Sequence, residues 1–254
     1  MVTTKKSKPI VLLFSLGFLG ILSIVPFIPK MLSLQSAELP LSVEIIQIIS
    51  VAQSSILLLL MIWLGSFFSK KVGLSAPVIF ALAHSENAFN QLKLQILPAV
   101  IGGISGGIFI LLFLSAFSGY LPAEFLSAGE KLMPPWYTKI LYGGITEELL
   151  VRWGLMSFFV WGIYRITQKS NSEIRSHNYV VAIILSSLIF GLGHLPMAFS
   201  LSPEVTAPLV AYIILGNAAF GFIAGYLYWK HGLECAIEAH MIAHITMIIG
   251  ASFA

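Results

Sequence analysis

The sequence predicts an all-α membrane protein that crosses the bilayer about seven times. Hydrophobic residues make up 57% of its 254 residues, and charged residues make up 10%. A soluble domain has roughly 25% charged residues, and the mean hydropathy of this chain is +0.92. The apolar runs are long and continuous, as in transmembrane helices, whereas the strands of a membrane β-barrel alternate in polarity over about ten residues.

Three expected spans occupy the N-terminal half of the chain, at residues 10–28, 43–68 and 97–117. A short basic segment precedes the first span, and no small-residue cleavage site follows it. We therefore expect an uncleaved span rather than a removed signal peptide. The third span contains two overlapping pairs of small residues spaced four apart, which favour close packing against other helices. These residues are Gly102, Gly103, Gly106 and Gly107.

Residues 76–95 are the ambiguous part of this half, because polar side chains are mixed with apolar ones. The pattern fits an amphipathic helix lying at the membrane interface. It fits a polar loop with helical character equally well, and we do not count the segment as a span.

The C-terminal half is expected to hold four further spans, at residues 136–163, 179–195, 208–229 and 233–253. The polar segments 118–135 and 165–177 are predicted to be loops. Neither an internal repeat nor a long linker divides the chain. We therefore expect one integral membrane domain, with N-terminal membrane helices in residues 1–135 and a C-terminal helix core in residues 136–254.

Basic residues are distributed unequally between the expected loops, and the side richer in Lys and Arg usually faces the cytoplasm. With the N-terminus inside, the inside segments hold Lys5, Lys6, Lys8, Lys70, Lys71, Lys93, Arg165, Lys169, Arg175 and Lys230. The outside segments hold Lys30, Lys131 and Lys139. The expected location is a bacterial cell membrane, with a cytoplasmic N-terminus and an external C-terminus. The net charge of +3 is small and scattered, so no nucleic acid partner is expected.

The fourth span contains three ionisable residues, Glu147, Glu148 and Arg152. An unpaired charge at the bilayer centre costs about 2.5 to more than 10 kcal/mol. Glu148 and Arg152 are four residues apart and are predicted to pair on one helix face. Glu147 points about 100° away from Glu148 on an α-helix, and it lacks a partner of opposite charge on its own helix. Small residues on its face, such as Gly143, leave room for another helix or a substrate.

Histidines in two later spans add to this set. His194 lies near the end of the fifth span, and His240 and His244 share one face of the last span. Two chemistries fit these residues. In one, Glu147 acts as a general base on water while histidines position the water and stabilise the oxyanion. In the other, Glu147, His194, His240 and His244 hold a divalent metal such as zinc. The expected span boundaries place His194 nearer the outer face and His240 nearer the inner face.

The order of these residues resembles the CPBP group of intramembrane proteases, which includes CAAX prenyl endopeptidases and bacteriocin-processing or immunity relatives. The resemblance covers residues 136–254 and rests on three motifs on separate hydrophobic helices. They are Glu147-Glu148-x-x-x-Arg152, Phe190-x-x-x-His194, and His240 in the last span.

The resemblance implies a helix core around a hydrophilic cavity and no required cofactor. It implies that Glu147 and His194 activate water, and that His240 binds the oxyanion together with a residue four positions on. That residue is usually Asn or Asp in the group and is His244 here. A neutral imidazole can still donate a hydrogen bond. Glu148, Arg152 and Phe190 are expected to be structural supports.

The resulting hypothesis is an intramembrane endopeptidase that cleaves a hydrophobic or lipidated, membrane-anchored substrate, with membrane lipid as its other partner. Two alternatives stay open. One is a non-catalytic membrane scaffold or immunity protein, in which His244 reflects lost activity. The other is a proton-coupled transporter, since buried Glu and His side chains also mark ion pathways.

Overall fold

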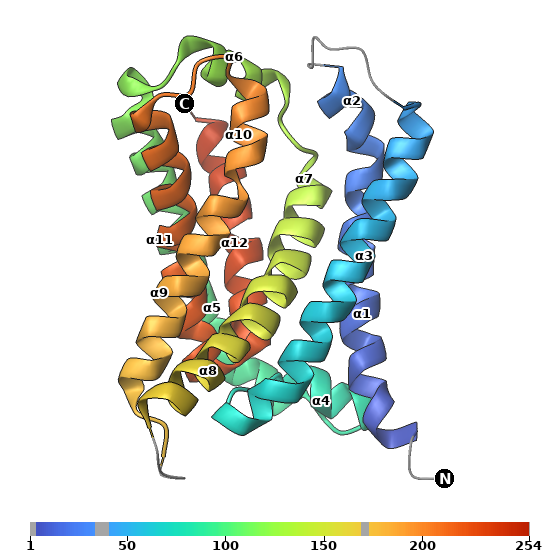
Figure 1. Ribbon diagram of the computed structural model, residues 1–254. Coiled ribbons are helices and arrows are strands. Elements are labelled where there is room, and N and C mark those ends of the chain that lie inside the picture. Colours follow the sequence, from blue (N-terminus) through green and yellow to red (C-terminus); the bar gives the residue numbers. More distant parts are fainter. Residues whose placement is uncertain (1–3, 34–40, 169–172, 254) are drawn as a thin grey trace.

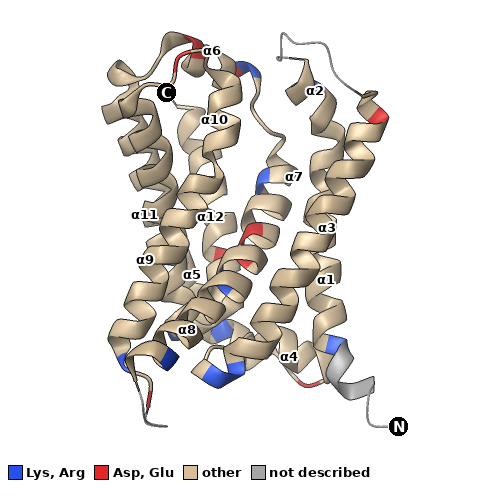
Figure 2. Ribbon diagram, in the orientation of Figure 1, with Lys and Arg blue, Asp and Glu red and all other residues tan. Residues whose placement is uncertain are grey.

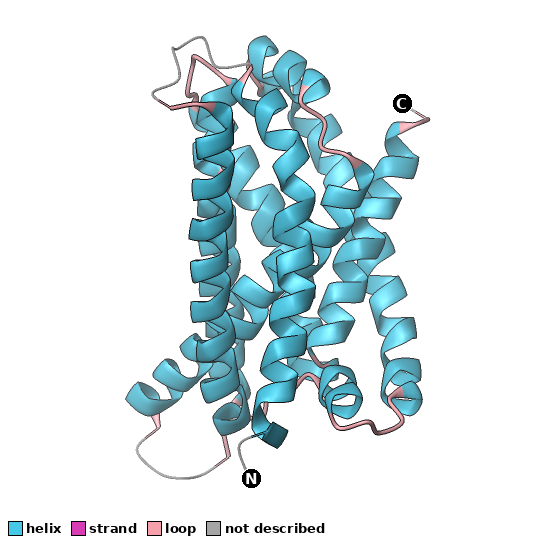
Figure 3. Cartoon of the chain, turned by 90° about the vertical axis from the view of Figure 1, so that its right-hand side faces the viewer, coloured by secondary structure: helices cyan, strands magenta, loops and turns pink. Residues whose placement is uncertain are grey.

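The computed structural model describes residues 4–33, 41–168 and 173–253. These residues form helices joined by turns and contain no strand (Figure 1, Figure 3). Among the described residues, seven helical segments are long and apolar enough to cross a membrane. They are Lys8–Leu32, Val43–Val72, Phe89–Tyr120, Trp136–Thr167, Ser176–Leu201, Ala207–His231 and Leu233–Ala251. The predicted polytopic all-α fold is confirmed.

The first three spans are built from α1 (Thr4–Ile24), η1 (Val25–Phe27) and α2 (Ile28–Leu32), then α3 (Val43–Phe68) and η2 (Ser69–Val72), then α5 (Phe89–Phe117) and η3 (Ser118–Tyr120). The short helices α4 (Pro77–Ala83) and α6 (Ala123–Lys131) flank the third span. The fourth span joins α7 (Trp136–Thr138), η4 (Lys139–Glu147), η5 (Leu149–Met156) and α8 (Ser157–Thr167). The last three spans are α9 (Ser176–Gly193) with α10 (Leu195–Leu201), α11 (Ala207–His231) and α12 (Leu233–Ala251).

The chain enters at one end of the bundle and leaves at the other, as seven crossings require (Figure 1). Most Lys and Arg residues lie at the end where α1 begins, and few lie at the end where α12 finishes (Figure 2). The side chains of Lys5 and Lys6, and residue Lys169, are outside the described part of the structure.

Three segments differ from the sequence-based expectation. Residues 76–95 are split, because α4 ends at Ala83 and residues from Phe89 onward begin the third span. The predicted loop 118–135 contains the helix α6. The fifth span continues past Leu195 through α10 to Leu201, because Pro196 occupies the first turn of α10, where its missing N–H costs no hydrogen bond. The division of the chain at residues 135 and 136 stays a prediction.

Glycines allow the closest helix contacts, as the small-residue pattern of the third span predicted. A β-carbon at Gly103 would come within 2.6 Å of the Ala239 carbonyl oxygen on α12, and one at Gly106 within 2.8 Å of the Phe220 ring on α11. Helix α5 therefore packs backbone-close against both of the last two spans, as glycine-rich membrane helices do.

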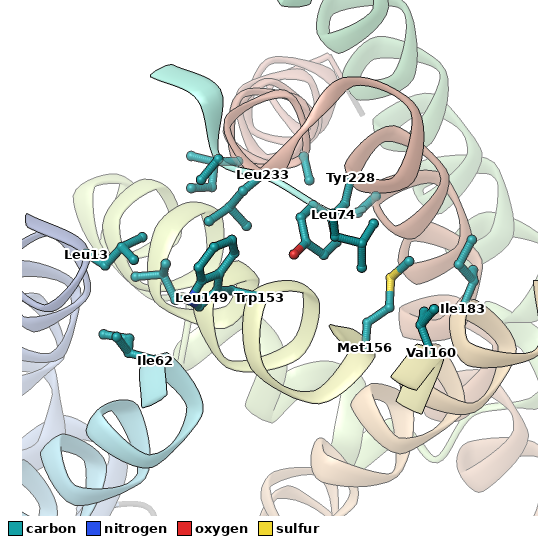
Figure 4. Packing of buried hydrophobic residues seen from close by; sticks show 14 of the residues in the cluster. Leu13, Ile62, Leu74, Leu149, Trp153, Met156, Val160, Ile183, Tyr228 and Leu233 are labelled. Carbon is teal, nitrogen blue, oxygen red and sulfur yellow. The ribbon is translucent and has the colours of Figure 1, made fainter. Parts of the chain in front are cut away.

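The apolar core surrounds the fourth span. Trp153 and Leu149 are fully buried there, and Tyr228 of α11 lies on the other side of Trp153 (Figure 4). Thr146 donates its hydroxyl hydrogen to the Gly17 carbonyl of α1 at 2.8 Å. The fourth span is thus held from both sides, which fixes the direction of the charged side chains that it carries.

Candidate active site

The helix segment that carries the charged residues is wound as a π-helix, from Lys139 to Glu147 and again from Leu149 to Met156. Its backbone hydrogen bonds link residues i and i+5, rather than i and i+4 as in the α-helix that the sequence predicts. π-helical turns are rare and occur frequently at functional sites. Two such segments in succession set the orientation of Glu147 and Glu148.

A cavity of about 660 Å³ opens beside this segment. All four residues predicted as catalytic, Glu147, His194, His240 and His244, lie in its lining. The lining also includes apolar side chains from α2, α5, α6 and α10, among them Met31, Phe113, Phe125 and Leu201. The cavity therefore combines one polar region with a large apolar wall.

Glu147 and His194 face each other across the cavity lining. Oε1 of Glu147 lies 3.9 Å from Nε2 of His194, and the two side chains are 18% and 35% exposed. Nδ1 of His194 lies 2.8 Å from the Phe190 carbonyl oxygen. A carbonyl only accepts hydrogen bonds, so Nδ1 carries the hydrogen and a neutral ring has a lone pair on Nε2. Two hydrogen-bond acceptors thus face the same small space.

His194 lies beside Glu147 because the fifth span does not end at residue 195, where the sequence predicted its end. The predicted end at residue 195 placed His194 near the membrane surface, whereas the span runs on to Leu201. His194 forms the junction between α9 and α10. Because α10 follows it, His194 lies inside the span rather than at its end, at the depth of Glu147.

Glu148 lies at the centre of a buried polar cluster. Its Oε1 is 3.1 Å from Nη1 of Arg152, as the four-residue spacing predicted, and 2.7 Å from Nδ1 of His240 on α12. Glu148 and Arg152 are both 0% exposed, and His240 is 5% exposed. The contact with His240 was not expected from the sequence, which assigned Glu148 and Arg152 to each other alone.

His240 and His244 share a helix face, as predicted, and their rings stack with centroids 4.8 Å apart. His244 packs against Gly143 of the π-helix, and its Nε2 is buried without a hydrogen-bond partner among the described residues. Gly144 lies against Met241 in the same interface. These two glycines let α12 approach the fourth span closely.

Phe190 connects the two histidine-bearing helices to the ion pair. Its ring lies edge-on to His194 with centroids 4.7 Å apart, and 6.4 Å from the ring of His240. The guanidinium carbon of Arg152 is 5.1 Å from the Phe190 ring centroid, within the range of a cation–π contact. The predicted supports thus contact each other and the histidines.

Polar residues outside the predicted site either line the cavity as well or make structural contacts elsewhere. Lys139, Tyr142 and Asn217 also line the cavity, and the Asn217 amide donates to the Ile213 carbonyl of its own helix at 2.8 Å. Tyr142 lies five residues before Glu147 in the i to i+5 pattern of the π-helix, a relationship that α-helical spacing does not reveal. Glu234 has a structural contact, because its Oε1 accepts a hydrogen bond from the Ile79 amide in the first turn of α4 at 2.8 Å.

The metal alternative would use the same four side chains as ligands, Glu147, His194, His240 and His244. Within residues 4–33, 41–168 and 173–253, no three His, Cys, Asp or Glu side chains come together as a group that could hold a metal ion. The four predicted ligands share the cavity but do not form such a group. Metal dependence stays a prediction.

Comparison with known protein families gives a match in the C-terminal half of the chain. Residues 129–246 match the family described as "Type II CAAX prenyl endopeptidase Rce1-like". The matched region begins in α6 and includes every residue predicted for the site. No curated protein and no solved structure gives a significant match.

Proposed function

Because residues 129–246 of this chain match the family model described as "Type II CAAX prenyl endopeptidase Rce1-like", we propose that the protein hydrolyses peptide bonds with a water activated by Glu147. The family supports intramembrane endopeptidase activity in general, and the seven apolar spans agree with a multi-pass membrane protein. The assignment of individual residues is our proposal.

The proposal rests on two hydrogen-bond acceptors that lie close together, Oε1 of Glu147 and Nε2 of His194. At 3.9 Å, Oε1 and Nε2 are too far apart for a direct hydrogen bond. A water about 2.8 Å from each atom can donate one hydrogen to the carboxylate and the other to the imidazole. Its lone pairs then point away from both groups, toward a substrate carbonyl in the cavity. Transfer of one proton to Glu147 during attack is general-base catalysis.

The histidines of α12 lie in the lining of the same cavity. We assign His240 and His244 to positioning the substrate or stabilising the oxyanion that forms when water attacks the carbonyl. Phe190 supports this arrangement, because its ring contacts both His194 and His240. Glu147, once protonated, can return the proton to the leaving amine.

The proposed substrate is a hydrophobic or lipidated peptide segment anchored in the membrane. The wall formed by residues such as Met31, Phe113 and Phe125 suits an apolar chain, while the scissile bond lies at the polar end near Glu147. Pockets that bind elongated ligands commonly combine apolar walls with a few polar groups that fix orientation. Membrane lipid is the other expected partner.

The test compares wild type with Glu147→Gln on a membrane-anchored peptide substrate reconstituted in liposomes. Glutamine keeps the size of the side chain and removes the base, so cleavage should fall by at least about 100-fold, in line with typical general-base contributions. Glu238→Gln is the matched control, because Glu238 is a half-buried carboxyl on α12 outside the cavity lining.

Equal cleavage by wild type and Glu147→Gln would refute the role of Glu147. Cleavage by neither the wild type nor the control, together with full biological complementation by Glu147→Gln, would instead support the scaffold or immunity alternative. Proton flux into liposomes that is lost in Glu147→Gln would support the transporter alternative.

We also propose that the end of the bundle where α1 begins faces the cytoplasm. Lys70 and Lys71 lie near the end of the second span, and Lys230 near the end of the sixth, and both of these spans end on that side of the bundle (Figure 1). The excess of Lys and Arg there follows the positive-inside tendency of membrane proteins. The proposed location is a bacterial cell membrane.

A further inference from the structure

A second hollow lies outside the candidate active site, where α5 and α11 meet at the surface of the bundle. It has a volume of about 480 Å³ and walls that are almost wholly apolar. Its lining includes Pro98, Ile101 and Gly102 of α5, and Phe222, Tyr226 and His231 of α11. The cavity that holds Glu147 shares none of its lining residues. We call this hollow the α5–α11 groove.

The α5–α11 groove faces the hydrocarbon of the membrane. Both of its walls belong to segments that are long and apolar enough to span the bilayer, Phe89–Tyr120 and Ala207–His231. The side chains of Ile101 and Tyr226 on these walls are 60% and 52% exposed. Exposed side chains on a spanning segment contact the lipid chains, which are as apolar as the side chains themselves.

The dimensions of the groove favour a lipid chain over a helix of another protein. The wall on α11 runs from Phe222 to His231, about 14 Å at 1.5 Å per residue. This length is close to half of the roughly 30 Å hydrocarbon thickness, so the groove covers the depth of one lipid leaflet. A helix of that length and about 10 Å across occupies roughly 1,100 Å³, more than twice the volume of the groove.

Basic side chains lie where the groove reaches the membrane surface. His231 lines the groove and is the last residue of α11, and Lys230 precedes it. Lys230 follows Tyr226 by four residues and Leu227 by three, so it shares the helix face that lines the groove. The Lys230 ammonium contacts the ring of Trp229 and, among the described residues, forms no ion pair. No Asp or Glu appears in the groove lining. Basic pockets between membrane helices bind anionic lipid headgroups.

We propose that the α5–α11 groove binds an anionic phospholipid, with an acyl chain along its walls and the headgroup phosphate beside Lys230 and His231. An ammonium and an imidazole both donate hydrogen bonds to phosphate oxygens. Leu227 and Ile223 line the groove and also belong to one hydrophobic cluster with Ala239 of α12. A lipid in the groove therefore supports the packing of α11 against the helix that carries the two cavity histidines, and it stabilises the folded protein.

Native mass spectrometry of the full-length protein in detergent measures the bound lipid. Phosphatidylglycerol and phosphatidylcholine with the same acyl chains are titrated separately. We expect wild type to bind one phosphatidylglycerol about fivefold more tightly than phosphatidylcholine, in line with the contribution of one lysine near a membrane surface. Lys230→Gln should lose this preference. Lys93→Gln is the matched control, because Lys93 is an exposed lysine five residues before Pro98, about 140° away around the helix. It should keep the preference.

Ile101→Trp tests the groove itself, because the larger side chain fills it. The affinity for phosphatidylglycerol should fall about 10-fold, as expected when extra volume is forced into a filled site. Leu112→Trp is the control, since Leu112 lies eleven residues further along the same face of α5, is 66% exposed and is outside the groove lining. Added phosphatidylglycerol should raise the unfolding temperature of wild type and Leu112→Trp more than that of Ile101→Trp.

Equal affinity of wild type for the two lipids, or the same change in Lys230→Gln and Lys93→Gln, would overturn the proposal. A dimer that Ile101→Trp abolishes and Leu112→Trp retains would assign the groove to a second copy of the chain, and would also overturn it. If Ile101→Trp does not fold, the comparison of the two lysine variants still decides. None of these measurements depends on peptide cleavage, so the lipid site and the proposed function can fail separately.

Discussion

The imidazole of His244 lies directly against the backbone of Gly143, so that a β-carbon at residue 143 would overlap Nε2 of the ring. This contact joins the π-helical segment η4 to α12 at the cavity. Gly143 was noted in the sequence as a small residue on the face of Glu147. The structure shows that the space it leaves is filled by a histidine from the last span.

Gly143→Ala is expected to reduce activity more than stability. The added methyl group pushes the His244 ring out of place, while the ring itself can move into the neighbouring cavity without unfolding the helix. We expect cleavage of a membrane-anchored peptide to fall about 10-fold or more, because ångström-scale displacement of a positioned group costs up to about 100-fold in rate. Gly162→Ala in α8 is the control, since no atom lies within 4 Å of a β-carbon there. Wild-type rates in Gly143→Ala would mean that the position of His244 does not matter for catalysis.

Arg152→Met is expected to destabilise the protein strongly. It leaves the buried carboxylate of Glu148 without its cation, and breaking one half of a buried ion pair typically costs about 3–5 kcal/mol. Arg152→Met combined with Glu148→Gln removes both charges and should recover part of the loss. Thermal unfolding in the same detergent measures both proteins. A double variant less stable than Arg152→Met would contradict the view that the unpaired charge is the cause.

Sequence reasoning was sufficient for features that depend on local spacing. The Glu148–Arg152 pair, the shared face of His240 and His244, and the packing role of Gly103 and Gly106 all follow from three- and four-residue periodicity. The second span was predicted at the residues that form α3. These features need no knowledge of the partner helices, because neighbours on one helix face are set by helix geometry.

Features that depend on distant partners were not predictable. The hydrogen bond from His240 to Glu148 joins residues 92 positions apart, and that from the Ile79 amide to Glu234 joins residues 155 apart. The π-helical winding also left no signal that we could find in the sequence. The depth of His194 was misplaced because the fifth span was predicted to end at residue 195, whereas α10 continues it to Leu201 with Pro196 in its first turn. Tertiary packing decided each of these cases. The catalytic roles of the site residues remain predictions.

Thr146→Val is expected to loosen the contact between the first and fourth spans. Valine keeps the shape of threonine but removes the hydroxyl that donates to the Gly17 carbonyl at 2.8 Å. The loss of one such buried hydrogen bond costs about 1 kcal/mol, and should appear as a lower unfolding temperature. Thr246→Val is the control, because the Thr246 hydroxyl bonds the Ile242 carbonyl of its own helix. Equal unfolding temperatures for the two variants would show that the hydrogen bond between Thr146 and Gly17 adds nothing to the stability of the protein.

Removal of divalent metal is expected to leave peptide cleavage unchanged. The proposed reaction uses Glu147 and His194 on water, and the described residues contain no three-ligand group for a metal ion. The measurement is the metal content of the purified protein, together with cleavage before and after a strong chelator. Loss of cleavage on chelation that zinc restores would contradict the glutamate mechanism and favour the metal alternative.

The direction of the chain in the membrane can be tested with cysteines placed at the two ends of the bundle. The native Cys235 is buried and is first replaced by alanine. Ser127 in α6 and His231 at the end of α11 are exposed residues at opposite ends (Figure 1). If the Lys-rich end is cytoplasmic, a membrane-impermeant maleimide added to intact cells labels Ser127→Cys, and labels His231→Cys only after the membrane is opened. The reverse pattern would place the N-terminus outside, and the end of the bundle that carries α6 and α10 on the cytoplasmic side (Figure 1).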